Sequence, residues 1–173
     1  PILNAAASEE GRKFAMRNAD YLYTPVFDLD QAAEVVADVR QKSAEVNRDV
    51  GVMTFCTIVC RPTQQEAEDY LDYYANQNAD WEAVDYLMKL QGMHAQSFTP
   101  DALANFRDRF AAGHGGYPLV GTPDHIADEL EKISATGIAG STLAFVDYAE
   151  EFPYFRDEVI PRLEKKGLRE PVR

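Results

Sequence analysis

The eleven residues VGVMTFCTIVC, at positions 50–60, constrain the fold more than any other stretch of the sequence. The run is almost continuously apolar and rich in β-branched side chains, which is typical of a parallel strand covered on both faces. Cys56 and Cys60 lie four positions apart in it, so the alternation of a strand points both to one side. Because no histidine lies nearby to complete a zinc site, we expect packed free thiols in a reducing compartment. A redox or ligand-lining role is the alternative.

Apolar runs and amphipathic stretches alternate on either side of this strand, as in βα units built on a parallel sheet. We expect further strands at residues 1–6, 20–26 and 141–146, and helices at residues 9–19, 28–48, 63–77, 122–137 and 150–167.

Four strands are too few for a closed barrel, since a (β/α)8 barrel takes about 250 residues and eight strands. The 173 residues, treated as a single unit, supply about four βα units. A half barrel exposes two strand edges and an apolar inner face, which favours pairing with the other half of the barrel, with a second chain or in a homo-oligomer. The first residue is proline rather than methionine, so we expect a fragment.

Residues 79–121 interrupt the alternation and predict a helical insertion with a closing loop. Residues 81–93 are amphipathic, and residues 99–113 begin with Thr99 as a cap before a proline. The stretch GHGGYPLVGTP follows, with three glycines in four residues, and predicts a loop that closes over a ligand.

Composition excludes several classes of partner. Acidic residues outnumber basic ones 29 to 17 and the net charge is −12, which argues against nucleic acid because phosphate backbones require a basic face. No apolar run approaches the roughly 20 residues of a membrane span, and the first residues do not resemble a secretory signal. We therefore expect a cytoplasmic protein with a small-molecule ligand and no membrane partner.

The turn NAAASEEG is the first candidate for chemistry. A strand ends in Asn4, small residues follow, and Ser8 precedes a helix, so its hydroxyl and the free backbone N–H groups face the same way. This arrangement binds anions such as phosphate. The alternative is an ordinary N-cap serine with alanines chosen for close packing. Glu9 and Glu10 favour that alternative unless their carboxylates point outward.

The histidines give the second candidate. His114 lies in the glycine-rich loop and is our choice for proton transfer or ligand contact, the alternative being an exposed loop histidine. We expect His125, in the first turn of a helix, to be solvated, and His94 is undecided. Neither a P-loop, nor a GxGxxG pattern, nor a nucleophilic triad is present.

Three stretches together carry a family resemblance: NAAASEEGRKFAMRNADYLYT, PLVGTPDHIADELEKISATGIAGSTLAFVDY and FPYFRDEVIPRLEKKG. They resemble the C-terminal half of the bacterial luciferase-like, flavin-dependent monooxygenases, in the branch of the dimethylsulfone, alkanesulfonate and pyrimidine monooxygenases. The resemblance implies an α/β fold, a luciferase-like (β/α)8 TIM barrel. This chain would supply strands five to eight and a helical insertion before the last strand, with reduced FMN at the C-terminal ends of the strands.

The resemblance also implies site residues. Ser8 of the SxxG turn would contact the flavin phosphate, with Ala7 beside it and Gly11 completing the pattern. Tyr117 and His114 would lie on the closing loop.

Alkanesulfonate-type members carry an arginine just before LVG. The nearest positions here are Ala112 and His114, and Arg109 lies a turn upstream, which leaves a sulfonate substrate in doubt. We count Arg109 with Tyr117 as a substrate or lid residue.

The implied activity is a monooxygenase that uses FMNH2 from a flavin reductase, with O2 as co-substrate, on a small sulfone, sulfonate or heterocycle. Two alternatives stay open. One is an F420-dependent oxidoreductase of the same fold, and the other is a non-catalytic half-barrel module that assembles with a partner chain.

Overall fold

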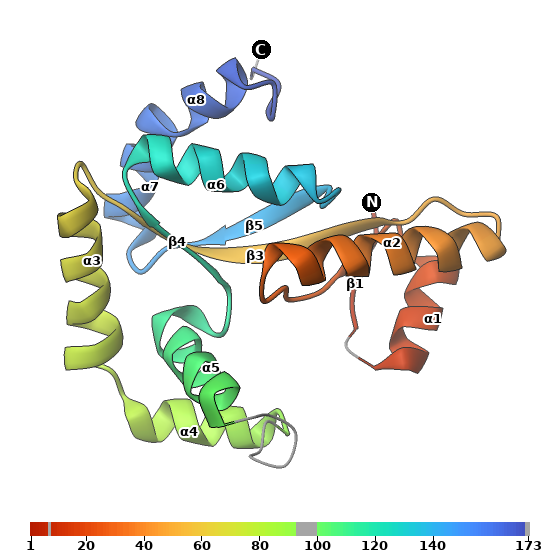
Figure 1. The fold of residues 1–173 in the computed structure, drawn as a ribbon, viewed down its shortest axis with the longest axis horizontal. Coiled ribbons are helices and arrows are strands. Elements are labelled where there is room, and N and C mark those ends of the chain that lie inside the picture. The colour runs from red at the N-terminus through yellow and green to blue at the C-terminus, as the bar shows by residue number, and fades with distance from the viewer. Residues whose placement is uncertain (7, 93–99, 172–173) are drawn as a thin grey trace.

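The computed structural model describes residues 1–6, 8–92 and 100–171. Four strands are each followed by a helix, as predicted (Figure 1). These four βα units are β1 (Leu3–Ala5) with α1 (Glu9–Asn18), β2 (Tyr21–Tyr23) with α2 (Leu29–Glu45), β3 (Gly51–Cys60) with α3 (Gln64–Asp72), and β5 (Gly140–Ala144) with α7 (Tyr148–Glu158).

The remaining elements lie between β3 and β5 or at the end of the chain. They are the π-helix η1 (Tyr73–Gln77), α4 (Trp81–Leu90), α5 (Pro100–Gly113), β4 (Tyr117–Gly121), α6 (Pro123–Ala135) and α8 (Ile160–Lys165). The expected helix 63–77 therefore ends in a π turn. The expected helix 150–167 is divided, with Pro161, which has no N–H to donate, in the first turn of α8. The expected cap Thr99 lies outside the described residues.

The described part of the chain holds five strands, so the expected count of four is wrong. Residues 117–121, which we expected as loop, form β4, and Leu119 pairs with Ile58 of β3. Glycines and Pro118 make this stretch resemble a loop. A short segment becomes a strand, however, when a long neighbour offers it a free edge, and proline is tolerated at such a site.

Every strand pair is parallel, and β3 is the centre of the sheet. Met53 pairs with both Tyr23 and Gly140, so β2 and β5 lie on opposite edges of β3. Cys56 likewise pairs with a residue of β4 and a residue of β5. β2 and β4 therefore follow one another along one edge of β3, and β5 takes the other. In the described chain β1 pairs only with β2, and β4 and β5 pair only with β3, so these three strands each keep an unpaired edge. The free edges of β1 and β5 are the two that a half barrel predicts, and the short strand β4 adds a third.

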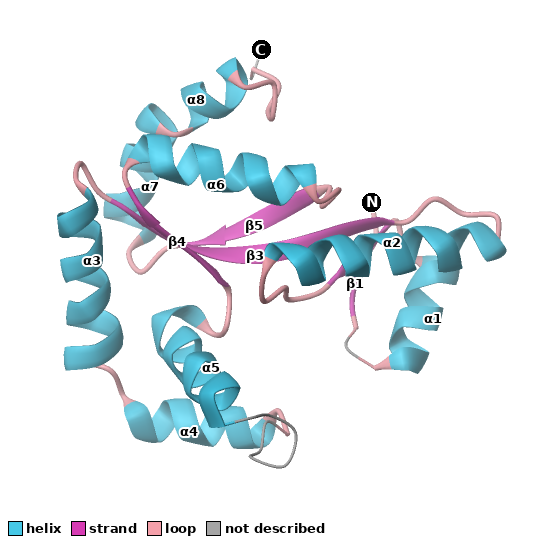
Figure 2. Cartoon of the chain, in the orientation of Figure 1, coloured by secondary structure: helices cyan, strands magenta, loops and turns pink. Residues whose placement is uncertain are grey.

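One face of this sheet carries the hydrophobic core. Val52, Cys56 and Ile58 of β3 are at most 2% exposed and belong to the cluster formed with residues of α1, α2, α6 and α7. Cys56 and Cys60 are buried free thiols, as expected. In Figure 2, α6, α7 and α8 lie on one side of β3 and β5, and α4 and α5 lie on the opposite side.

The other face is covered only near the C-terminal end of β3. Thr57 and Val59 are buried there, and Gly116 lies so close that a Cβ on it would sit 2.8 Å from the Phe55 ring. Towards the start of the strand, Met53 and Phe55 are only half-buried. The prediction of a strand covered on both faces therefore holds for the second half of β3 and is wrong for the first, where the face is the partly open apolar surface of a half barrel.

None of the described helices is both long and apolar enough to cross a membrane.

Candidate functional site

The C-terminal ends of the strands define the edge where a ligand is expected, because parallel α/β sheets bind ligands outside these ends. Five connections leave this edge: Ser8 follows β1, Asp28 follows β2, Arg61 follows β3, Thr122 follows β4, and Asp147 follows β5. The connections differ in which polar groups they leave available.

Ser8 caps the first of these helices. Its backbone is extended, and its Oγ accepts a hydrogen bond from the backbone N–H of Gly11 at 3.2 Å. The hydroxyl is exposed, so its own proton is free to be donated outward. Gly11 is required by packing, since a Cβ there would sit 2.9 Å from the Cβ of Ala6 and 3.1 Å from Ser8 Oγ. Ala7, the third residue of the predicted cradle, lies outside the described residues.

The two glutamates of this turn are drawn away from its open end. Lys13 Nζ lies 3.0 Å from a carboxylate oxygen of Glu9 and 2.8 Å from one of Glu10. The hydrogen bond and charge of Lys13 lower the pKa of Glu10. Both carboxylates therefore point along the helix toward a cation, the outward orientation that an anion site at this turn requires.

The helices that follow β2, β3 and β5 have carboxylates at their N-termini. Asp28 accepts from the N–H of Gln31, and Asp147 accepts from the N–H groups of Ala149 and Glu150. Thr63 at the start of α3 forms a capping box in which the Glu66 carboxylate accepts from its backbone N–H and from its hydroxyl. Among these helix starts, α1 and α6 have a hydroxyl cap with no carboxylate over it, since Thr122 caps α6. The helix α6 begins with Pro123, which has no N–H to offer a ligand, so α1 leaves more donors available.

Arg109 and Tyr117, which we predicted as substrate or lid residues, lie in one cavity at the end of β2. The cavity has a volume of about 440 Å³. The Arg109 guanidinium lies 5.5 Å from the centre of the Tyr117 ring and donates to the carbonyl of Phe27 at 3.2 Å. Its Nε has no hydrogen-bond partner among the described residues. Burial lowers the pKa of Arg109 and raises that of Tyr117. The described residues place no carboxylate within ion-pair distance of Arg109, so the cavity presents an unpaired cation.

His114 is exposed and has a positive φ of 57°. Its Nε2 lies 3.1 Å from Gln91 Nε2, and its ring packs 5.1 Å from the Phe110 ring. It does not line the Arg109 cavity. His125 is exposed, as expected, and His94 lies outside the described residues. No group of three His, Cys, Asp or Glu side chains in the described ranges is arranged to hold a metal ion.

A sequence profile described as luciferase-like monooxygenase matches residues 1–140. The chain belongs to the luciferase-like monooxygenase family. It is 26% identical to the dimethyl-sulfide monooxygenase of Hyphomicrobium sulfonivorans, an alignment that covers 96% of this chain and 41% of that protein. It is 27% identical to the FMNH2-dependent dimethylsulfone monooxygenase of Pseudomonas fluorescens (strain Pf0-1), over 92% of this chain and 45% of that protein. The chain thus spans less than half the length of these curated relatives.

The crystal structure of DmoA from Hyphomicrobium sulfonivorans aligns with a TM-score of 0.80 at 23% identity, over 95% of this chain and 41% of that chain. This likeness supports the fold. The luciferase-like chain described here is part of a (β/α)8 barrel, as the resemblance implied, with β4 as an additional short strand.

Sequence reasoning missed one pair of residues at the strand ends of this luciferase-like chain. Arg61 and Glu151 form an ion pair of 2.7 Å that joins the β3 and β5 connections. Glu151 is 8% exposed. A glutamate in the first turn of a helix is ordinary in sequence, and its partner lies 90 positions away, so no local pattern identifies the pair.

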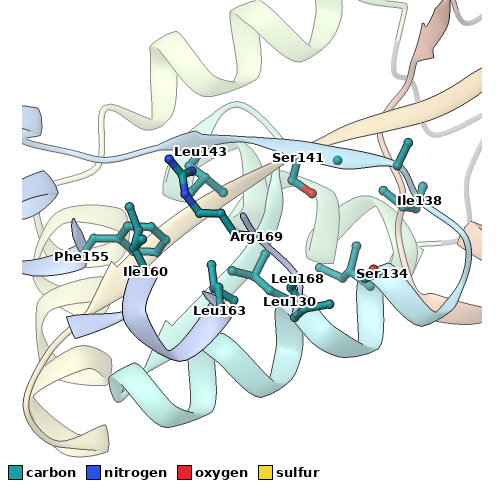
Figure 3. A pocket seen from close by; sticks show the side chains of 13 residues that line it. Leu130, Ser134, Ile138, Ser141, Leu143, Phe155, Ile160, Leu163, Leu168 and Arg169 are labelled. Carbon is teal, nitrogen blue, oxygen red and sulfur yellow. The ribbon is translucent and has the colours of Figure 1, made fainter. Parts of the chain in front are cut away.

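A further cavity lies on the helix-covered side of β5, away from the C-terminal ends of the strands. Its volume is about 300 Å³ (Figure 3). Apolar side chains of α6, β5, α7 and α8 and of the segments before β5 and after α8 line most of it, and Arg169 crosses it. This arrangement offers packing surface but no cluster of catalytic groups.

Proposed function

We propose that the chain is the C-terminal half of a reduced-flavin-dependent monooxygenase, and that its α1 turn holds the FMN phosphate. The observation that carries the proposal is the hydroxyl-capped start of α1, where Lys13 draws both glutamates aside. Three other helices at the strand ends, α2, α3 and α7, fill their N-termini with their own carboxylates. A phosphate meets repulsion at those three helices and donors at α1.

The residues of the α1 turn are chemically suited to bind the FMN phosphate. Ser8 Oγ–H would donate to a phosphate oxygen while the Gly11 N–H holds the hydroxyl in place. The backbone N–H groups of the first turn of α1 would supply further donors. Ala7 and Gly11 are proposed as the small residues that let the phosphate approach the backbone. When bound, reduced FMN supplies the electrons with which O2 is activated.

The substrate is proposed to lie over the Arg109 cavity, against Tyr117. His114 lies in the turn between α5 and β4, outside the residues that line this cavity, and is the proposed proton-transfer or ligand-contact residue. The glycines next to it are proposed to let this turn move toward the ligand. Curated relatives act, by their names, on dimethyl sulfide and dimethylsulfone, which are small organic sulfur compounds. We propose a small organic molecule of the sulfone, sulfonate or heterocycle class here.

The proposed activity requires partners. The half-exposed apolar face around Met53 and Phe55 and the free edges of β1 and β5 are proposed to pack against the N-terminal half of the barrel. An oligomer of such barrels and a flavin reductase that supplies FMNH2 complete the proposed system.

Titration with FMN and with riboflavin tests the phosphate site directly, because the two ligands differ only in the phosphate. We expect FMN to bind at least about 10-fold more tightly than riboflavin, a difference of about 1.4 kcal/mol. Ser8→Asp places a carboxylate over the turn while preserving the cap, and is expected to abolish that preference. Thr122→Asp is the matched control, since Thr122 caps α6 in the same way.

Equal affinity for FMN and riboflavin in the unmodified protein, or an unchanged preference in Ser8→Asp, removes the phosphate site. Tight binding of F420 and not of FMN would favour the alternative function, an F420-dependent oxidoreductase of the same fold. Failure to bind either cofactor when the N-terminal half of the barrel is supplied favours the non-catalytic half-barrel module.

A further inference from the structure

The Arg61–Glu151 ion pair makes hydrogen bonds to residues at the C-terminal ends of three strands. Arg61 Nη2 donates to Glu151 Oε1 at 2.7 Å, and Nη1 donates to the carbonyl of Cys60 at 2.9 Å. The backbone N–H of Arg61 donates to the carbonyl of Gly121, the last residue of β4, at 3.0 Å. The guanidinium also lies 4.0 Å from the centre of the Tyr70 ring in α3. Arg61 therefore contacts the end of β4 through its backbone, and the end of β3 and the last turn of α3 through its side chain.

Glu151 fixes the third strand end. Its second carboxylate oxygen, Oε2, accepts from the backbone N–H of Val146 at 3.1 Å and from that of Asp147 at 3.5 Å. These residues form the connection after β5. The carboxylate thus joins the cation on β3 to the backbone that leaves β5.

The connection held in this way is one wall of a cavity at the same edge of the sheet. The cavity has a volume of about 250 Å³, and Phe145 and Val146 form one side of it. Ala112 and Gly113, at the end of the insertion helix α5, also line it. Tyr74 holds the end of α5 in place, because its hydroxyl donates to the carbonyl of Ala112 at 2.9 Å.

We propose that Glu151, together with Arg61, is a positioning residue that holds the backbone of Val146 and Asp147, and so sets the Phe145–Val146 wall of this cavity and the shape of the ligand site at the strand ends. The functional part of this proposal rests on the proposed flavin site. It names residues that touch neither cofactor nor substrate but act through the backbone of the β5 connection.

A role in stability alone does not account for the pair. Replacing a buried ion pair by apolar side chains of similar volume is often neutral or stabilising, so the ionic form is not needed to hold the fold together. An apolar pair, however, cannot accept from the N–H groups of Val146 and Asp147. Val146 is 50% exposed, so water can take over these N–H groups once the carboxylate is gone, and the connection is then free to move.

The experiment uses two variants and a control. Arg61→Met with Glu151→Leu removes both charges and both acceptors, and Glu151→Gln keeps a side-chain oxygen in place. The control, Lys166→Met with Glu131→Leu, removes an ion pair of 2.6 Å between α6 and α8. Amide hydrogen exchange is measured residue by residue, and the free energy of unfolding and the FMN affinity are measured on the same samples.

We expect the double variant to exchange the Val146 and Asp147 amides at least about 10-fold faster than the unmodified protein, since local opening is read from exchange at single residues. Exchange in the β3 core is expected to stay unchanged. Glu151→Gln should keep most of the protection of both amides, and the control should leave them within about 2-fold. FMN affinity is expected to fall at least about 5-fold in the double variant and not in the control.

Unchanged exchange at Val146 and Asp147 in the double variant overturns the proposal. Faster exchange spread evenly over the chain overturns it as well, because that reports global stability. Faster local exchange with unchanged FMN affinity overturns the functional part. If the unmodified protein binds no FMN, the proposed function fails. The exchange data alone then decide whether the Arg61–Glu151 pair holds the β5 connection in place.

Discussion

On one face of β3, Val52, Cys56 and Ile58 are buried under helices, whereas on the other face Met53 and Phe55 remain half-buried. The same strand therefore has one face packed as a protein interior and one packed only where the insertion reaches it. In a closed barrel the second face of β3 points toward the barrel interior. Its partial exposure here is expected for a chain that spans only 41% to 45% of the length of two curated relatives. For this reason, substitutions on the covered face should lower the free energy of unfolding more than substitutions on the open face.

The largest expected effect is at Ile58, on the covered face. Ile58 is 1% exposed in the main core cluster, so Ile58→Ala removes packed methyl groups and leaves a cavity. We expect the free energy of unfolding to fall by about 3 kcal/mol. Urea denaturation followed by circular dichroism measures it. A loss below about 1 kcal/mol would mean that this face is not packed as an interior.

The second effect is chemical reactivity. Burial raises the pKa of Cys56 to about 11, so little thiolate is present at pH 8. A cysteine introduced by Phe55→Cys lies on the half-buried face and is expected to react with a thiol reagent at least about 100-fold faster than the native cysteines. Labelling followed by peptide mass spectrometry compares the rates in one sample. The rate at Cys56 should rise with pH up to about 11. Equal rates at pH 8 contradict the distinction between the faces.

Phe55→Ala is expected to have a smaller effect. The ring stacks on Tyr23 with centroids 6.2 Å apart but stays half-exposed, so we expect a loss of about 1 kcal/mol. In a protein that contains the rest of the barrel, the same substitution should cost about 3 kcal/mol, because the ring is then fully buried. Equilibrium unfolding of both proteins gives the comparison. Equal costs in the two contexts contradict an inward-facing role for this surface.

The two faces also explain how much could be predicted from sequence. The periodicity of residues 28–48 and the apolar run of residues 50–60 were sufficient to predict α2 and β3, because burial under helices leaves a pattern in one segment. The open half of β3 could not be predicted from that run, since its apolar residues suit the interior of a barrel whose other strands are absent here. β4 was missed because it depends on pairing with Ile58 and its neighbours, far away in sequence.

The candidate site also contains residues that a local sequence pattern predicts and residues that only the fold brings together. The Ser8 cap and its bond to Gly11 are local, and the turn sequence predicts them. Arg109 and Tyr117 were predicted through the family resemblance, and the structure brings them into one cavity. The Arg61–Glu151 pair joins residues 90 positions apart, so only the fold reveals it.

The smallest expected effect is at the hydrogen bond on the open face. Tyr23 Oη and Thr142 Oγ1 lie 2.5 Å apart, and Thr142 is exposed. Tyr23→Phe keeps the ring on Phe55 and removes only this bond, which water can replace, so we expect a loss of about 0.5 kcal/mol. Tyr74→Phe is the half-buried counterpart, because the Tyr74 hydroxyl donates to the carbonyl of Ala112 and burial raises the pKa of Tyr74 to about 12. That substitution should cost about 1.5 kcal/mol, measured by the same urea titrations at pH 7. A cost at Tyr23 equal to that at Tyr74 would show that the open face is shielded from water after all.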